Sequence, residues 1–320
     1  MGICSPSSGY RKMKTPCTPK DQVRIIEGHG LSIRSDSELE NLFMEYNYYF
    51  ATGYTLHNRN KNSKKIVGMD SDEMIQALLF DTDLRNKCFG LIAQIELRLK
   101  RVIPYVHTMK FQADGYLSSS SFNSGSQVSN FNHSDLLIKI QDAIRSSYRV
   151  EAYVPHNMRK YGNLPFWVAC ELLSLSSISK IYSGLFYDQQ IGVFRELDNI
   201  RDIKYRLYMA NSSVLEVERK DFITWLHLIV LMRNRICHHS RLLNKQYIVT
   251  INPCTSHHGI MLPSNTLFAA IYACLFILGK KSITQETMKA FKELFGKYPS
   301  VKPDLIGFTA DWETILGDLT

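Results

Sequence analysis

The segment WLHLIVLMRNRICHHS, residues 225–240, combines a helical apolar pattern with a cluster of polar side chains at its end. The pattern predicts a helix from about Asp221 to Ser240. Residues at steps of three and four share one helix face, here Phe222, Leu226, Ile229, Arg233 and Ile236. Arg233 therefore falls in an apolar stripe, where a guanidinium needs a carboxylate or an anionic ligand.

Asn234 and His238 are four residues apart and lie about 40° from each other around the helix axis. They form one polar edge beside Arg233, whereas Arg233 and His238 are separated by about 140° and meet only at a shared ligand or through the long arginine side chain. These residue types suit phosphodiester chemistry, since arginine holds phosphate oxygens and histidine exchanges protons near neutral pH. The structural alternative is that they interact with the last carbonyls of the helix.

A second helix, predicted from about Asp83 to Met109, carries a carboxylate within its apolar pattern. Glu96 follows Ile95, so we expect it to be half-buried and a candidate partner for Arg233. The alternative is an ion pair with Lys100 one turn later, worth only about 0.3–0.5 kcal/mol. The spacing leaves both pairings open.

The rest of the chain also has mainly helical patterns, and the predicted class is mainly α. We expect residues 1–17 to be a disordered tail and residues 18–320 to form a single helical domain with a long loop near 113–134. At most a short strand or hairpin is expected, and its candidate is residues 247–251. Further helices are expected at residues 18–28, 36–50, 134–150 and 164–187, from there to about Met209, and at 264–279 and 284–295.

Net charge, cysteine usage and the length of the apolar runs indicate the kind of partner and the compartment. The chain has 38 Lys and Arg against 30 Asp and Glu, a net charge of +8 that favours an anionic partner such as RNA. The seven cysteines are scattered without a C-x-x-C pair, which fits a reducing cytoplasm. The longest apolar run, residues 267–278, is too short to span a bilayer, so no membrane partner is expected.

Several basic side chains are candidate RNA contacts, although a solvated surface is the alternative for each. They lie in the loop at residues 58–65, on the second helix and next to the polar edge: Arg98, Lys100, Arg101, Arg235 and His239.

A metal site is the main alternative interpretation of the residue types in this part of the chain. Cysteine and histidine residues between positions 237 and 258 supply enough soft ligands for zinc, but their spacing matches no zinc finger or ribbon, and we predict no metal and no cofactor. The residues in question are Cys237, His238, His239, Cys254, His257 and His258.

The run from Arg233 to His238 resembles the R-N-x-x-x-H signature of the HEPN superfamily. Other segments, in the same order, resemble the Abi-like abortive infection family of the AbiD/AbiF type, and the resemblance covers roughly residues 14–315. These segments are TPKDQVRIIEGHGL at 18–31, YNYYFATGY at 46–54, Ile95-Glu96, LPFWVA at 164–169, and Gly307-Phe308 with Trp312.

The resemblance implies a HEPN-type helical bundle with additional N-terminal helices, which usually forms a homodimer with one composite cleft. It implies a metal-independent endoribonuclease in phage defence, toxin-like and cytoplasmic, in which the RNA 2′-hydroxyl attacks the adjacent phosphorus. His238 would be general acid or base, Arg233 would stabilise phosphorane charge, Asn234 would position the phosphate or His238, and Glu96 would orient Arg233. An antitoxin or a partner non-coding RNA is a further expected partner. The alternative is a non-catalytic RNA-binding or scaffold protein.

Overall fold

The computed structural model describes residues 15–123, 131–202, 219–254 and 262–319. They form two compact units, one ending at Leu79 and one beginning at Phe80, and each is described by itself. Most of the predicted tail, residues 1–14, lies outside the described residues. A single domain over residues 18–320 stays a prediction.

The first unit is built from short helices that start where the sequence supplies caps. Helix α1 (Pro19–Gly28) begins with a capping box, in which Thr18 and Asp21 satisfy each other's backbone amides, and it packs on α2 (Asp36–Glu45). The prediction of one helix over residues 36–50 is wrong, because the Asn47 side chain accepts a hydrogen bond from the Tyr49 amide (2.9 Å) and starts a new helix. That helix is α3 (Tyr48–Thr52), which leads into the 3₁₀ helix η1 (Gly53–Asn58).

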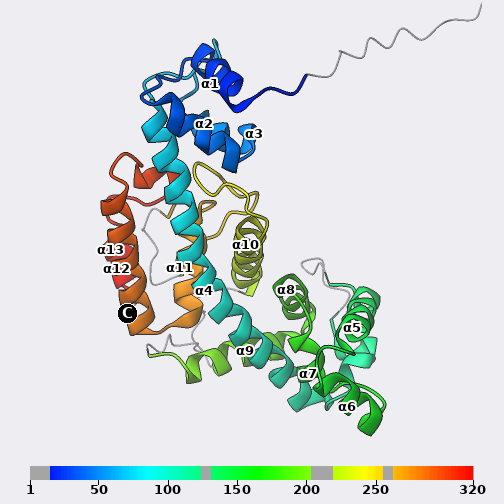
Figure 1. Cartoon of the computed structure of the whole chain (residues 1–320). Coiled ribbons are helices and arrows are strands. Elements are labelled where there is room, and N and C mark those ends of the chain that lie inside the picture. The colour runs from blue at the N-terminus through cyan, green and yellow to red at the C-terminus, as the bar shows by residue number, and fades with distance from the viewer. Residues whose placement is uncertain (1–14, 124–130, 203–218, 255–261, 320) are drawn as a thin grey trace, which may run out of the picture. The chain divides into compact units, whose positions relative to one another are not determined.

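Helix α4 (Ser71–Phe111) begins in the first unit and supplies the longest element of the second (Figure 1). The second unit continues with η2 (Gly115–Leu117), η3 (Ser119–Ser121), α5 (His133–Ser147), α6 (Tyr153–Tyr161), α7 (Phe166–Glu171), α8 (Leu175–Gly184), α9 (Tyr187–Asn199), α10 (Arg219–Cys237), α11 (Leu267–Leu278), α12 (Lys281–Lys297), η5 (Pro303–Ile306) and α13 (Trp312–Gly317).

The core of the second unit is centred on α11, of which every residue is buried. Helices α10 and α12 pack against it, and α8 packs against the other side of α10. Trp225 of α10 meets Phe276 of α11 edge to face, with ring centroids 5.0 Å apart. A helix that is apolar all round, as α11 is, can be buried on all sides in this way.

Three other segments can be compared with their predictions, and a local cap explains the first difference. The helix predicted over residues 164–187 is interrupted, since the Ser174 hydroxyl accepts from the Ser177 amide (3.4 Å) and starts α8. Residues 247–251, where the sequence allows a short strand, do not form one: among the described residues this segment makes two backbone hydrogen bonds to residues 264–265 and joins no ladder. The described part of the loop near 113–134 is packed, because Tyr116 stacks on Phe166 (4.9 Å).

The mainly α class is confirmed. Outside helices, the described residues pair only through two isolated β-bridges, Ser32 with Asp70 and Arg59 with Ile66. Within these same ranges, no helix has both the length and the apolar character needed to cross a membrane.

Candidate functional site

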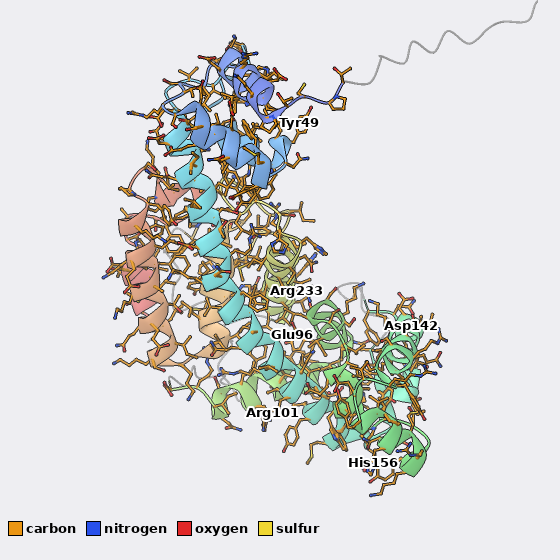
Figure 2. All side chains as sticks on the ribbon, viewed as in Figure 1. Tyr49, Glu96, Arg101, Asp142, His156 and Arg233 are labelled. Atoms are coloured by element: carbon orange, nitrogen blue, oxygen red, sulfur yellow. The ribbon has the colours of Figure 1, made fainter. Side chains whose placement is uncertain are left out.

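Helix α10 carries the predicted site and buries its apolar face as the spacing predicts. Phe222, Leu226, Ile229 and Ile236 are each no more than 2% exposed. Arg233, which shares their stripe, lies at its margin and is half-buried (Figure 2). Asn234 is half-buried as well, and His238 follows the helix end and is exposed.

The three side chains of the motif make no hydrogen bond or ion pair within the described part of the chain. This is unusual for Arg233, because a guanidinium withdrawn from water loses hydration that only a hydrogen-bonding partner replaces. Arg233, Asn234 and His238 are therefore available to a ligand, and the arginine favours an anionic one.

The C-terminal end of α10 is held by a buried ion pair on α4. The Arg85 guanidinium donates to the carbonyls of Arg235, Ile236 and Ser240, each at 3.2 Å. The fully buried Asp81 accepts from Arg85 (2.9 Å) and, through its second oxygen, from two backbone amides just beyond the helix, those of Leu242 (2.9 Å) and Leu243 (2.7 Å). This pair fixes the backbone on both sides of His238.

The helix ends in a Schellman motif built on a non-glycine residue. The Ser240 amide donates to the Arg235 carbonyl and the His239 amide to the Ile236 carbonyl, while His239 adopts the left-handed conformation with φ 52°. An L-residue pays about 1–2 kcal/mol for that conformation, which glycine adopts freely. The histidine is thus retained in a place where glycine would be more stable.

We therefore expect His239→Gly to stabilise the fold by roughly 0.5–1 kcal/mol, measured as a higher urea midpoint. Asn244→Gly is the control, because Asn244 has φ 50° but asparagine tolerates that region, so its gain should be smaller. If His239→Gly lowers RNA affinity while raising stability, His239 is a ligand contact. A loss of stability would contradict the strain argument.

A groove lies between α8 and α10, next to the motif, and apolar side chains of α10 such as Ile223 and Val230 form part of its lining. Its volume is about 190 Å³, and Asn234 lines it together with His227 and Lys180, both of which are exposed. His227 and Asn234 are seven residues apart, within about 20° around the helix axis, so they continue one stripe that ends at His238. Three serine residues of α8 complete the polar lining: Ser176, Ser179 and Ser183.

Glu96 pairs with Lys100 in this structure, at 3.1 Å, and forms no ion pair with Arg233. Lys100 also donates to the carbonyl of Glu171 (3.0 Å). The local i,i+4 alternative is the arrangement that the structure contains, so Glu96 does not orient Arg233 here. A direct role of Glu96 in chemistry stays a prediction.

Some of the candidate RNA contacts already make hydrogen bonds within the fold, whereas others are exposed. Arg98 donates to the carbonyls of Ile277 and Leu278 at the end of α11, and Arg235 donates to Gln246 and lies over the Tyr247 ring, 4.9 Å from its centroid. Burial lowers the pKa of Arg98 from its ordinary value. Arg101 remains more than half exposed, with Glu196 at 3.6 Å, and His239 is exposed. Of this set, Arg101 and His239 are the two exposed residues.

Comparison with known protein families shows to which family this chain belongs. The model of the family described as Abi-like protein matches residues 41–244. This chain belongs to the Abi-like family. Family membership associates it with abortive infection, a form of phage defence. No curated protein and no solved structure gives a significant match.

The Abi-like match includes the main groups described at the end of α10. It contains the motif, the lining of the groove and the Asp81–Arg85 pair, and it ends at residue 244, just beyond the amides that Asp81 holds. Helices α11, α12 and α13 lie outside the matched range.

The residues of the alternative metal site are only partly described. Cys254 is buried and accepts a hydrogen bond from the Tyr272 hydroxyl (3.1 Å), whereas His257 and His258 lie outside the described residues. Among the residues that are described, His, Cys, Asp and Glu side chains form no group of three suited to a metal ion.

Sequence reasoning missed three features of this Abi-like site, and two of them have a signal in the sequence. Asp81 and Arg85 have opposite charges four residues apart on the same stripe as Leu78 and Cys88, which indicates a buried pair. His227 precedes Asn234 by two helical turns, so the polar edge extends further than the R-N-x-x-x-H signature. Lys180 carries no comparable signal, because only the packing of α8 on α10 brings it to the groove.

Proposed function

We propose that this Abi-like protein is a metal-independent endoribonuclease of phage defence, with a HEPN-type site at the end of α10. The proposal rests on a contrast between side chains that hydrogen-bond within the fold and side chains that have no such partner. Arg98, Lys100 and Arg235 are used within the fold, whereas Arg233, Asn234 and His238 have no partner in the described part of the chain. Polar side chains without internal partners suit a ligand that supplies the partners.

The proposed reaction is transesterification within the RNA. The 2′-oxygen forms a bond to the adjacent phosphorus and the bond to the 5′-oxygen breaks, which leaves a 2′,3′-cyclic phosphate and a 5′-hydroxyl. His238 takes the proton from the 2′-hydroxyl or returns one to the 5′-oxygen. Arg233 neutralises the charge that develops on the phosphorane oxygens, and Asn234 positions the phosphate.

Two copies of the chain complete the proposed site. The reaction moves one proton away from the 2′-hydroxyl and one onto the 5′-oxygen, while each chain contributes one motif histidine, His238. A homodimer that joins two α10 ends in one cleft supplies both a base and an acid. The exposure of His238 leaves it accessible for such an arrangement.

The groove between α8 and α10 is the proposed path of the RNA strand next to the cleaved phosphate. Lys180 places a positive charge at the groove that Asn234 also lines, and the hydroxyls of Ser176 and Ser179 donate to phosphate or ribose oxygens. The net charge of +8 provides long-range attraction for the same strand.

The test is cleavage of total RNA by the purified protein in excess EDTA, followed by analysis of the new ends. We expect cyclic phosphates and 5′-hydroxyls, with specific activity that falls as the protein is diluted below its dimerisation range. Ends carrying 5′-phosphates, or activity that depends on an added divalent ion, would contradict the proposal.

The second candidate is an RNA-binding or scaffold protein that does not cleave. It is favoured by one observation: no described group accepts or donates a hydrogen bond at the His238 ring, so nothing in the single chain sets its tautomer. Stable RNA binding without cleavage, in the presence of every tested partner RNA, would select this function.

A further inference from the structure

A pocket separate from α10 lies within the first unit. Its volume is about 430 Å³, within the range of about 300–1,000 Å³ common for small-ligand sites. Residues of α1, α3 and η1 line it, and most of the lining is apolar: Ile25, Leu56 and the rings of Tyr48 and Tyr49 contribute. Tyr49 is 68% exposed, so a large aromatic ring lies at the pocket with most of its surface in water (Figure 2).

Two buried polar atoms of the pocket residues have no hydrogen-bond partner. They are the Tyr48 hydroxyl and the Gln22 side-chain carbonyl oxygen. The Gln22 amide nitrogen donates to the Cys17 carbonyl (3.3 Å), which assigns the other end of that side chain as the acceptor. A buried polar group left unpaired costs free energy, so both atoms favour a ligand that satisfies them.

The protonation state of Tyr48 determines which hydrogen bonds its hydroxyl can make to a ligand. Burial raises the pKa of Tyr48 from its ordinary value, and the nearby Arg59 opposes the rise only in part. The phenol therefore stays neutral and both donates and accepts, while Gln22 accepts. A matching ligand has a flat apolar face together with donors and acceptors on its edge.

The positive charge around the pocket indicates that the ligand also carries a negatively charged group. Arg59 is among the lining residues, and the loop that follows contains Lys61, Lys64 and Lys65. Lys65 is engaged, because it donates to the Gly28 carbonyl (2.7 Å), but Lys61 and Lys64 are exposed. A flat ring that has hydrogen-bonding edges and an attached phosphate is a nucleotide.

We infer that this pocket binds a nucleobase, with Tyr49 stacking on its face, Tyr48 and Gln22 pairing with its edge, and Arg59 near its phosphate. The base belongs either to a free nucleotide or to an unpaired position in an RNA strand. The inference deepens the proposed function, since it gives the RNA a second contact, and in that respect it rests on it. Base–aromatic stacking of this kind is common in proteins that bind single strands.

The test measures binding with His238→Ala protein, so that cleavage plays no part in the result. The ligands are the four nucleoside 5′-monophosphates and short single-stranded oligoribonucleotides, with an abasic strand of equal length for comparison. Tyr49→Ala should weaken binding roughly tenfold or more through lost stacking, and Tyr48→Phe roughly three- to tenfold through one lost hydrogen bond.

Matched variants separate the pocket from general effects. Tyr161→Ala removes a tyrosine that is 60% exposed in the second unit, and Tyr46→Phe removes a hydroxyl in the first unit outside the pocket lining, so both should bind as the parent does. Tyr48→Phe should not lower the melting temperature, because it removes an unpaired hydroxyl.

Binding of mononucleotides that both pocket variants weaken identifies a site that takes a free nucleotide. Binding of strands alone, with the abasic strand weaker, identifies a base within RNA. The inference is overturned if neither ligand binds, or if Tyr48→Phe and Tyr49→Ala bind like the parent. Because the readout is affinity, an absence of cleavage would count against the nuclease and leave the pocket standing.

Discussion

His238→Ala is expected to reduce RNA cleavage by about 10²–10⁴-fold, the usual contribution of a positioned general acid or base. The side chain is exposed and makes no hydrogen bond or ion pair in the described part of the chain, so its removal should leave the melting temperature nearly unchanged. Cleavage is measured in EDTA with a defined RNA under single-turnover conditions. The loss should therefore appear in rate and not in folded fraction.

Arg233→Ala should lower the same rate by a comparable factor and also weaken RNA binding, because it removes charge from the bound phosphate. Arg233→Lys should restore little, since lysine lacks the planar fork that holds two phosphate oxygens.

Exposed residues on other helices provide the controls for both variants. His156 on α6 is exposed, and the Arg145 side chain on α5 is 82% exposed (Figure 2 labels His156). Their alanine variants should cleave at the parental rate. Full activity in His238→Ala would remove the histidine from the mechanism, and full activity in Arg233→Ala would remove the site from α10.

The sequence predicted helices reliably because periodicity is a local property, and it failed where a single side chain overrides that periodicity. Asn47 and Ser174 each cap a new helix inside a stretch that reads as continuous. The segment at 247–251 has the β-branched composition of a strand, but no partner strand is paired with it in the described chain.

Within the site, spacing predicted which residues share a face but not which helices meet. It placed Arg233 in the apolar stripe and Glu96 at a half-buried position, as the structure has them. Whether Glu96 reaches Arg233 or Lys100 depends on how α4 and α10 pack, which no one-dimensional pattern contains. The same holds for Lys180, which lies at the groove because α8 packs on α10.

Asp81→Ala should destabilise the second unit by about 3–5 kcal/mol, the cost of removing one partner of a buried ion pair. Three hydrogen bonds are lost together: the variant leaves the Arg85 guanidinium without its carboxylate and the amides of Leu242 and Leu243 without an acceptor. Asp81→Asn should cost less, because its carbonyl oxygen still accepts from the two amides while the charge that balances Arg85 is lost.

Urea unfolding followed by tryptophan fluorescence measures this effect in the correct unit, since all three tryptophans, Trp167, Trp225 and Trp312, lie beyond Leu79. The control is Asp142→Ala, which breaks an exposed pair with Arg145 (side chains 64% and 82% exposed) and should cost at most about 1 kcal/mol.

Replacing both charges tests whether the effect comes from the unpaired cation. Asp81→Leu with Arg85→Met removes the ion pair as a whole and should be less destabilising than Asp81→Ala alone, because no buried charge remains without a partner. If the double variant is stable but cleaves RNA poorly, the Asp81–Arg85 pair is retained because it positions His238, and the stability of the fold does not require it. If Asp81→Ala costs no more than Asp142→Ala, the pair does not hold the end of α10, and the positioning argument for His238 fails with it.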